Sequence, residues 1–376
     1  MKILILGSVA LPVPPPMQGG TERIVYWQAV GLARRGHEVT LVAAHGSKAD
    51  PAYALVEIGG GDTVAGSVLS SQPSSRDPAL ESVDRFRVKP GMTSEFTEGS
   101  RSLRKEMIYM AQVSQYLLDH GKECDVILNN MRGGESILLP VAKMIGKPFV
   151  TVMHLPIFDA LSDLFKQYQT NVITISNAQR EGFDGLTYIG TTYNATDLSE
   201  LPFQKTAGTY LLMMGSIAPH KNQKDGILAA KKLGKPIVLA GKIGNQGYWD
   251  KEIAPLVDGV SVVHKGEMGI EEKAALLGGA EALLFPIVWP EPFGLVMIEA
   301  MATGTPVVAY RNGAVPEVVE EGKTGFVVDP TVDALVGGVQ KIGSIDRTYC
   351  RAYVEAHFTV EKMIESLEAI LQKLHN

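Results

Sequence analysis

The stretch EPFGLVMIEAMATGTPVVAY, residues 291–310, decides the fold class of this chain. Its middle is apolar on nearly every side, which is typical of a buried helix, and a β-rich run follows almost directly. Glu299 lies inside that apolar helix, and a buried carboxylate is costly unless it is paired or hydrogen-bonded. We therefore expect Glu299 to have a partner. Glu291 lies on the loop that leads into the helix.

Short β-rich runs alternate with helical stretches along most of the chain, which predicts parallel sheets covered by helices on both faces. A first series of strands is expected at residues 2–7, 38–43, 125–130, 149–154 and 171–176. A second series is expected at residues 210–215, 236–241, 260–266, 281–286 and 306–310. The pattern predicts an α/β fold with two Rossmann-like, doubly wound domains facing each other across a cleft.

A polar segment with a proline and no clear period, TYNATDLSELPFQKTAGT, separates the two series and is interpreted as a linker. We assign residues 1–195 to an N-terminal domain and residues 196–356 to a C-terminal domain. Residues 357–376 are predicted to be helical, with an apolar face that must pack on one of the domains. This face comprises Met363, Leu367, Ile370, Leu371 and Leu374. Residues 46–100 interrupt the alternation and are expected to be a functional or mobile loop region.

Composition and charge exclude several function classes. The chain has 376 residues, of which 45% are hydrophobic and 20% charged, as expected for a globular protein of two domains. A net charge of -6 argues against a general nucleic-acid binder. Neither a secretory leader nor a membrane-spanning run is recognised, and Cys124 and Cys350 are expected to be reduced structural thiols. We expect a cytoplasmic protein.

A weak association with the inner face of a membrane is a further hypothesis. Arg101, Arg104 and Lys105 could approach an anionic surface. The alternative is a solvated helix face, which three charges in an acidic chain usually form.

In doubly wound sheets, ligands bind beyond the carboxyl ends of the strands, and several unusual residues fall at such places. Gly19 and Gly20 open a helix, where free amides suit an anion such as a diphosphate, although a plain glycine turn would look the same. His154 ends a strand and could hydrogen-bond a substrate hydroxyl or have a structural role. A nicotinamide cofactor is not expected, because only Gly7 stands where a dehydrogenase carries G-x-G-x-x-G.

The second half of the chain offers a cation and a carboxylate at comparable places. Lys221 stands where a strand gives way to a helix, and its ammonium group could neutralise a leaving phosphate or simply be solvated. Glu299 could accept hydrogen bonds from the two hydroxyls of a ribose. Its alternative partners are a backbone amide or a basic side chain such as Arg311. We expect no metal site and no cofactor.

A set of motifs follows in order along nearly the whole chain: GGTERIV, MHLP, ITISNAQRE, YNATDL, GSIAPHKN, AGK, E-x7-E within residues 291–299, and GAVPEVVEEGKTGFVVDP. This ordered set resembles the family 4 retaining glycosyltransferases of the GT-B fold. The resemblance implies a hexosyltransferase that moves a sugar from a UDP- or GDP-linked donor to an acceptor hydroxyl with retention. It also implies a donor bound mainly by the second domain, an acceptor bound mainly by the first, and a C-terminal helix that crosses back to the first domain.

The resemblance further implies roles for individual residues. Glu299 would hold the ribose hydroxyls, Glu291 would contact the donor sugar, and Lys221 would counter the charge of the diphosphate. His154 would contact the sugar near the reaction centre. Backbone amides of the helix start would approach the sugar and the diphosphate, and the glycine pair of the first domain would close over the phosphates; these residues are Phe293, Gly294, Leu295, Gly19 and Gly20.

One position departs from the family pattern. Ser216 stands where the family usually carries an arginine that pairs with the diphosphate, and serine cannot replace that fork of donors. Either another cation, such as Lys242, serves the phosphate, or the chain is a nucleotide-sugar-binding partner subunit with impaired catalysis. A nucleotide-sugar epimerase with the GT-B fold is a third hypothesis. The acceptor can be a glycan, a lipid or a small molecule.

Overall fold

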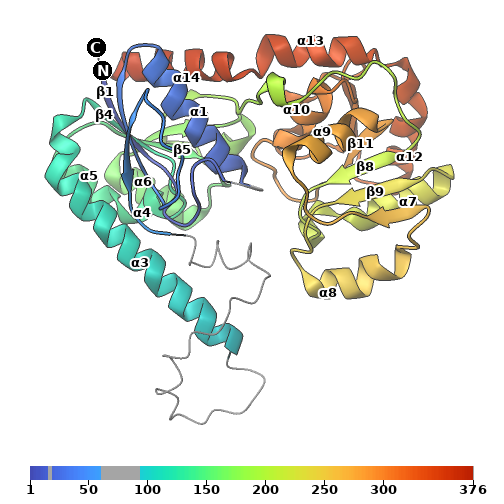
Figure 1. The fold of residues 1–376 in the computed structure, drawn as a ribbon, viewed down its shortest axis with the longest axis horizontal. Helices are drawn as coiled ribbons and strands as arrows, with labels where there is room; N and C mark the ends of the chain where they lie inside the picture. The colour runs from blue at the N-terminus through green and yellow to red at the C-terminus, as the bar shows by residue number, and fades with distance from the viewer. Residues whose placement is uncertain (16–18, 61–93, 376) are drawn as a thin grey trace. The chain divides into compact units, whose positions relative to one another are not determined.

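The computed structural model describes residues 1–15, 19–60 and 94–375 (Figure 1). Among these residues, the strands form a seven-stranded sheet in the order β3-β2-β1-β4-β5-β6-β7 and a six-stranded sheet in the order β10-β9-β8-β11-β12-β13. The pairs at the centre of each sheet, β1 with β2 and β4, and β8 with β9 and β11, are parallel. Both orders reverse beside the first strand of the sheet, which confirms the predicted doubly wound α/β class.

The first sheet contains β1 (Lys2–Leu6), β2 (Glu38–Ala43), β3 (Ala54–Glu57), β4 (Val126–Asn129), β5 (Phe149–Met153), β6 (Asn171–Thr174) and β7 (Thr187–Thr191). Its helices are α1 (Gly20–Arg34), α3 (Ser94–His120), α4 (Gly134–Ile137), α5 (Leu139–Ile145) and α6 (Asp159–Tyr168). Every strand expected in this half is confirmed. β3 was not expected, because it lies inside the region 46–100 that we predicted to be a loop; residues 61–93 of that region lie outside the described residues.

The second sheet contains β8 (Leu211–Met214), β9 (Ile237–Ala240), β10 (Val262–His264), β11 (Ala282–Phe285), β12 (Val307–Tyr310) and β13 (Gly325–Val328). Its helices are α7 (Gln223–Leu233), α8 (Gln246–Tyr248), α9 (Ile270–Gly279), α10 (Leu295–Ala302), α11 (Val315–Val318), α12 (Val332–Lys341) and α13 (Arg347–His357). The central strands β11 and β12 are buried along their whole length, as expected for a parallel sheet covered on both faces.

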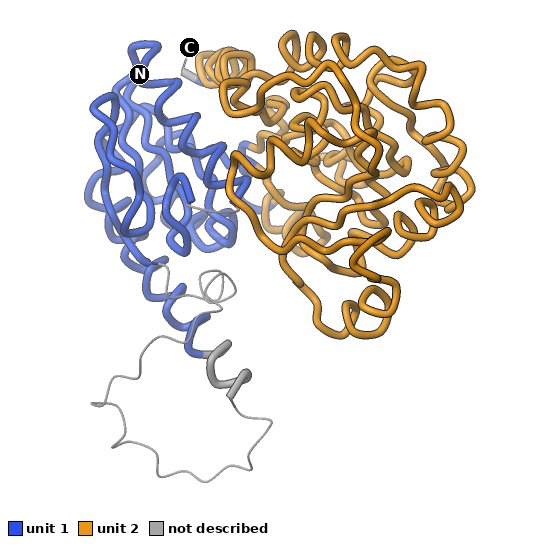
Figure 2. Tube along the Cα trace, turned by 45° about the vertical axis from the view of Figure 1, so that its right-hand side comes forward, with its two compact units in different colours: residues 1–152, 167–171, 374–376 blue, residues 153–166, 172–373 orange. Residues whose placement is uncertain are grey.

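The chain divides into two compact units (Figure 2). One comprises residues 1–152, 167–171 and 374–376, and the other comprises residues 153–166 and 172–373. The second unit contains the whole six-stranded sheet, and the first contains β1 to β4 with most of β5. Within the described part of the chain, none of the helices has the length and apolar composition needed to cross a membrane.

The last helix, α14 (Val360–His375), buries the apolar face that the sequence predicts. Met363, Leu367, Ile370 and Leu371 are buried, whereas Leu374 is half-buried. The helix packs against β7: a side chain on Gly190 would collide with Ile370, and the Oγ of Ser366 donates to the carbonyl oxygen of Thr191 at 3.4 Å.

The two cysteines are free thiols. Cys350 is completely buried, and burial raises the pKa of its thiol to about 12. Because the thiolate is the reactive form, Cys350 is chemically inert at neutral pH, as expected for a structural cysteine.

Candidate functional site

The loops that follow β8 and β11 meet at the carboxyl edge of the second sheet, where the strand order reverses. The Nζ of Lys221 lies 2.7 Å from the Oε2 of Glu291, and the two side chains are 24% and 13% exposed. The same loops are joined through their backbones, because the amide of Val288 donates to the carbonyl oxygen of His220 at 3.0 Å. The structure thus brings two predicted site residues together as an ion pair.

Local backbone geometry holds both partners of this pair. Lys221 ends a short 3-10 helix, Asn222 follows in the left-handed region with φ 54°, and α7 begins at Gln223. The backbone of Glu291 packs directly against Gly313. A Cβ at position 313 would lie 2.4 Å from the carbonyl oxygen of Glu291. The amide of Ala314 donates to that same oxygen at 3.0 Å. Position 313 must therefore be a glycine, because any side chain there would collide with the loop that carries Glu291.

Trp289 is a third member of this cluster that the sequence did not single out. Its Nε1 donates to the Oε2 of Glu291 at 2.9 Å, so the indole and Lys221 share one carboxylate oxygen. The ammonium group of Lys221 also lies 5.7 Å from the centre of the Trp289 ring. The ring of His220 packs on the indole at 5.1 Å, and burial, together with the charge of Lys221, lowers the pKa of His220. Two donors thus hold the Oε2 of Glu291.

Glu299 lies in α10 with a side chain 13% exposed, and its Oε1 is 2.5 Å from the Nζ of Lys273 on α9. Arg311, the basic partner considered from the sequence, instead donates to the carbonyl oxygen of Val327 at 3.3 Å. The carboxylate in the apolar helix is therefore paired, as expected, but by a lysine that the sequence did not identify. A half-buried pair of this kind presents both a hydrogen-bond acceptor and a donor to a ligand.

The start of α10 places the remaining predicted residues of this loop. Gly294 adopts φ 83° at the N-cap, and no side chain caps the amides that begin with Leu295. A side chain at 294 would collide with Met297, so glycine is required there for both reasons. Phe293 is buried, and its ring lies 6.1 Å from the ring of Tyr193 and 5.8 Å from that of Phe358. Phe293 therefore anchors the loop through packing, and only its backbone remains for a ligand.

Ser216 and Lys242 lie on neighbouring loops. The amide of Ile217 donates to the carbonyl oxygen of Lys242 at 2.8 Å, so the loops after β8 and β9 run side by side. A Cβ on Gly244 would lie 2.0 Å from the Oγ of Ser216, which leaves little room there for a larger side chain. Among the described residues, Lys242 makes no ion pair. It is thus the cation next to the position where an arginine was expected.

The other predicted residues lie at the first sheet. His154 directly follows β5 and is half-buried, and the backbone on either side of it is held by Gln179, whose Nε2 donates to the carbonyl oxygens of Met153 and Leu155. Gly19 is the N-cap of α1 and Gly20 its first residue, and no side chain among the described residues caps this helix start. The amides of such a helix start have no partner within the helix, so the anion hypothesis for Gly19 and Gly20 stays a prediction.

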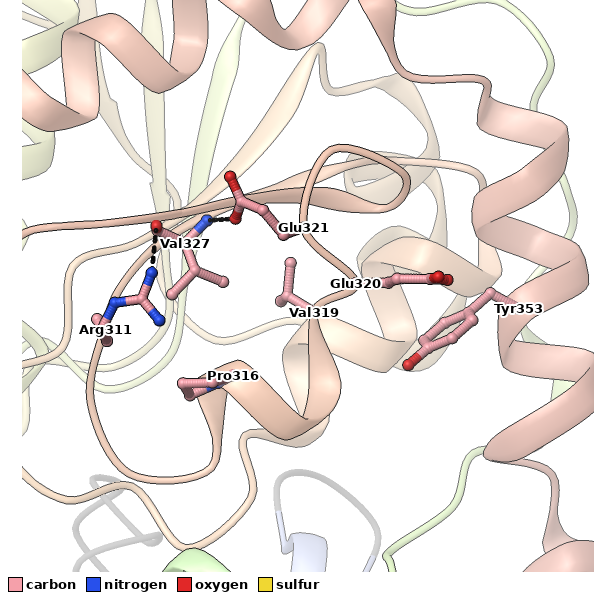
Figure 3. A pocket seen from close by; sticks show the side chains of 7 residues that line it. All are labelled: Arg311, Pro316, Val319, Glu320, Glu321, Val327 and Tyr353. Carbon is pink, nitrogen blue, oxygen red and sulfur yellow. Dashed lines mark hydrogen bonds between the residues drawn. The ribbon is translucent and has the colours of Figure 1, made fainter.

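A separate hollow of about 270 Å³ lies beside β12 and β13 (Figure 3). It is lined by Arg311, Pro316, Val319, Glu320, Glu321, Val327 and Tyr353, and none of the predicted site residues belongs to it. Its charged groups are already used: Glu321 accepts from the amide of Val327 at 2.7 Å, and Glu320 accepts from Lys323 and Tyr349. This hollow is smaller than typical ligand sites and is not the candidate site.

Lys273 and Trp289 are thus the residues that sequence reasoning missed. Nothing in the sequence around Lys273 indicates that it pairs with Glu299. The pair forms only because the fold places α9 beside α10. Trp289, two residues before Glu291, could have been considered, since a half-buried indole N–H usually finds an acceptor. In the described ranges, no three side chains of His, Cys, Asp or Glu lie close enough together to hold a metal ion.

Part of this chain matches a family model, and longer stretches of it align with known proteins. Residues 199–356 match the family model described as Glycosyl transferases group 1. The chain is 26% identical over 386 aligned residues to a glycogen synthase of Mycobacterium tuberculosis, covering 91% of this chain and 86% of the relative. It is 45% identical over 101 residues to an MMP alpha-(1->4)-mannosyltransferase of Mycolicibacterium hassiacum, covering 26% of this chain and 24% of the relative.

Solved structures resemble the whole chain. AviGT4, a glycosyltransferase involved in avilamycin A biosynthesis, has a TM-score of 0.67 at 20% identity and covers 100% of this chain and 98% of its own. HepE of Anabaena, solved in complex with UDP and glucose, has a TM-score of 0.70 at 18% identity, with 99% of each chain covered. The fold of this chain is therefore that of the GT-B glycosyltransferases.

Proposed function

We propose that this chain is a retaining glycosyltransferase of family 4, which transfers a hexose from a UDP- or GDP-linked donor to an acceptor hydroxyl. The observation that carries the proposal is the ion pair of Lys221 with Glu291 at the switch point of the second sheet. Ligands of doubly wound sheets bind at this place. The match of residues 199–356 to Glycosyl transferases group 1, and the E-x7-E spacing of Glu291 and Glu299, support the choice of ligand.

The proposed donor lies along the loops after β8, β9 and β11. The diphosphate competes with Glu291 for the ammonium group of Lys221, which then faces the charge that develops as the sugar leaves. Glu291, still held by Trp289, accepts hydrogen bonds from the sugar hydroxyls. The uncapped amides at Gly294 and Leu295 lie at the positive end of α10 and suit the sugar and the diphosphate.

The ribose binds, in this proposal, to the pair of Glu299 and Lys273. One oxygen of Glu299 is held by Lys273 at 2.5 Å, which leaves the other oxygen to accept from a ribose hydroxyl. Because a hydroxyl both donates and accepts, a carboxylate beside an ammonium group matches it better than either group alone. Lys273 is thus a positioning residue for Glu299.

Lys242 takes part of the role that an arginine at Ser216 would have. Its backbone lies beside Ile217, one residue from Ser216, and no ion pair within the described residues occupies its ammonium group. A lysine supplies a point charge and not a bidentate fork, so we expect weaker phosphate binding than in relatives with arginine.

The reaction proceeds with the acceptor oxygen attacking the anomeric carbon from the face that the diphosphate leaves. The bond between the anomeric carbon and the phosphate oxygen breaks, and the departing diphosphate takes the proton of the acceptor hydroxyl. No protein nucleophile is required, so catalysis rests on positioning and on stabilising the phosphate charge. His154 contacts the sugar near the reaction centre, and Gly19 and Gly20 approach the phosphates. We place this reaction in the cytoplasm.

The test is incubation of the chain with UDP-, GDP- and ADP-linked hexoses and a mixture of sugar and lipid acceptors. We expect release of one nucleoside diphosphate, a glycosylated product, and an anomeric configuration that matches the donor. An inverted product would overturn the retaining step, and absence of transfer with all donors would overturn the proposal. We also propose that no metal is needed, so EDTA should not change the rate; a loss of activity that Mg²⁺ restores would contradict this.

Ser216 favours one alternative, a partner subunit that binds a nucleotide sugar without transferring it. Saturable binding of a donor, with neither hydrolysis nor transfer, would identify this case. An epimerase would instead change the sugar of the donor when no acceptor is present.

A further inference from the structure

The turn that follows Lys221 has an unusual backbone conformation. Asn222 adopts φ 54° and ψ 49°, in the left-handed region, between the 3-10 helix that ends at Lys221 and the first residue of α7. Among the described residues, the non-glycine positions with positive φ are Gln169 and Asn222. Such conformations cost free energy and persist only where the surrounding contacts hold them, often at functional sites. The contacts of Asn222 therefore show what this turn is for.

The side chain of Asn222 is held by Asp225 in the first turn of α7. Its Nδ2 donates to the Oδ2 of Asp225 at 2.8 Å. The same oxygen accepts from the hydroxyl of Tyr310 at 2.8 Å. Tyr310 ends β12 and is 1% exposed. A chain of hydrogen bonds thus runs from the buried sheet to the turn next to Lys221.

Each link of this chain also has an ordinary structural explanation. A buried phenol hydroxyl needs an acceptor, and a carboxylate in the first turn of a helix is favoured by the helix dipole. Neither explanation requires both donors to meet on one oxygen, or the second donor to come from a residue in the left-handed region. Burial and the hydrogen bond to Asp225 raise the pKa of Tyr310, so its hydroxyl remains a donor at neutral pH.

The segment before Lys221 is fixed as well. Gln223 is buried, its Nε2 donates to the carbonyl oxygen of Ser216 at 3.0 Å, and its Oε1 accepts from the amide of Ala218 at 3.3 Å. The amide of Lys221 donates to the carbonyl oxygen of Ala218 at 3.0 Å. Because the loop is held here, the backbone angles of Asn222 decide how the side chain of Lys221 lies relative to α7.

A right-handed conformation at Asn222 would change this geometry. The short 3-10 helix would then continue into α7, and the side chain of Lys221 would turn with it. Its ammonium group lies 2.7 Å from the Oε2 of Glu291, and 5.7 Å from the ring centres of Phe285 and Trp289. All three partners belong to the end of β11 or to the loop that follows it, so a rotated lysine would lose them together.

We propose that Asn222, Asp225 and Tyr310 are positioning residues for Lys221. Their hydrogen bonds hold the left-handed turn that directs the ammonium group to the loop after β11, and in this way they set how strongly the site binds phosphate groups. The inference rests on the proposed function for the identity of the ligand as a nucleoside diphosphate. It adds three residues that act on this ligand through Lys221.

The first test is a double-mutant cycle on nucleoside diphosphate binding. Calorimetry measures UDP, GDP and ADP with the wild type, Asn222→Ala, Lys221→Met and the double variant. We expect Asn222→Ala to weaken the diphosphate that binds by about five- to tenfold, and to add nothing in the Lys221→Met background, because it acts only through this lysine. Asn222→Gly should stay within about twofold of the wild type, since glycine adopts positive φ without a tether.

Matched controls separate positioning from a general loss of stability. Gln169→Ala replaces the left-handed residue of the first unit, and Tyr210→Phe removes a hydroxyl that donates to the carbonyl oxygen of Leu276 at 2.7 Å. Neither substitution should change diphosphate affinity. Tyr310→Phe removes one link of the chain and should weaken the diphosphate by about threefold.

The second test needs no nucleotide. The indole N–H of Trp289 donates to the carboxylate oxygen that Lys221 contacts, so its proton NMR resonance reports the place of the ammonium group. We expect this resonance to shift in Asn222→Ala in the same direction as in Lys221→Met, and to stay in place in Asn222→Gly and Gln169→Ala. Trp289→Phe assigns the signal.

The outcomes separate this inference from the proposed function. Suppose that a diphosphate binds and Lys221→Met weakens it. If Asn222→Ala then binds like the wild type, or costs as much again in the Lys221→Met background, the inference is wrong while the donor site stands. If no diphosphate binds, the proposed function fails, and the indole resonance alone decides whether the turn positions Lys221. Should Asn222→Ala not fold, Asp225→Asn tests the same link, and an unchanged affinity and resonance in that variant would overturn the inference.

Discussion

The two switch points of this molecule have the same topology and opposite arrangements of charge. In the second sheet, the loop after the first strand carries the cation Lys221, and the loop after the neighbouring strand carries the carboxylate Glu291. In the first sheet, the carboxylate Glu22 follows the first strand and the cation Arg132 follows its neighbour. Topology thus decides where a ligand can bind, and the side chains at that place decide which ligand it is.

The two ion pairs also differ in how far their side chains are buried. Both partners of the second pair are half-buried, and Lys242 adds a positive charge on an adjacent loop. In the first pair the carboxylate is almost fully buried and the cation is open to solvent. The second pair therefore exposes both of its charges in part, whereas the first exposes mainly its cation.

The largest effect is expected at Lys221. Lys221→Met removes the charge that faces the leaving diphosphate, so the turnover number should fall by about 100- to 1,000-fold. Steady-state kinetics with saturating donor measures this. Lys224→Met is the matched control, because Lys224 lies nearby in the first turn of α7 and pairs with Glu252 at 2.7 Å on the surface. If the turnover number of Lys221→Met is close to that of the control, Lys221 does not take part in the reaction, and the proposed role of the second switch point is wrong.

A smaller effect is expected at the pair of Lys273 and Glu299. Lys273→Met and Glu299→Gln should each weaken nucleoside diphosphate binding by about tenfold, or about 1.4 kcal/mol, without changing the turnover number at saturation. Calorimetry with the ribo- and 2′-deoxyribonucleotide should show that the variants lose the preference for ribose. Lys235→Met serves as the control, since Lys235 pairs with Glu281 at 2.6 Å at the amino edge of the same sheet. Equal losses for both nucleotides would contradict the ribose role.

Lys242 should contribute less than Lys221. Lys242→Met should weaken a nucleoside diphosphate by about three- to fivefold and leave the matching nucleoside unaffected, because one point charge in partial contact with solvent is worth about 1 kcal/mol. The exposed Lys231 of α7 offers a control substitution, Lys231→Met. The same loss for nucleoside and diphosphate would show that Lys242 does not serve the phosphates.

The smallest effect is expected in the pH dependence of stability, through the protonation of His220 next to Lys221. Burial and the charge of Lys221 lower the pKa of His220 below its ordinary value of 6.5. As pH falls below 6.5, the unfolded chain takes up the proton first, so this contribution to stability is present above 6.5 and is lost below it. Melting temperatures between pH 7.5 and pH 5, measured for the wild type and His220→Gln, should therefore decline less in the variant. Parallel curves would show that His220 does not respond in this way.

Much of the fold follows from the sequence, because strands of parallel sheets are continuous apolar runs that end in glycine or polar residues. β3, β7 and β13 were missed because they lie at sheet edges and are only partly buried, so that a weaker apolar pattern suffices there. The meeting of Lys221 and Glu291 was foreseeable in outline, because both follow strands of one sheet. The direct ion pair between the two side chains could not be predicted from the sequence.

The partners of the two carboxylates depend on packing between elements that are distant in sequence. Glu299 was expected to need a partner, and the fold supplies Lys273 from α9, not Arg311. The place of Arg132 beside Glu22 depends in the same way on the pairing of β1 with β4. No period or motif in the sequence reports which helix lies beside which.

The most direct test of the central claim is calorimetric titration of the wild type and Lys221→Met with UDP, GDP and ADP. The claim predicts that one nucleoside diphosphate binds the wild type with a dissociation constant between about 1 μM and 1 mM, and that Lys221→Met weakens it by about tenfold or more. Binding of none of the three, or equal affinity in both proteins, would contradict it.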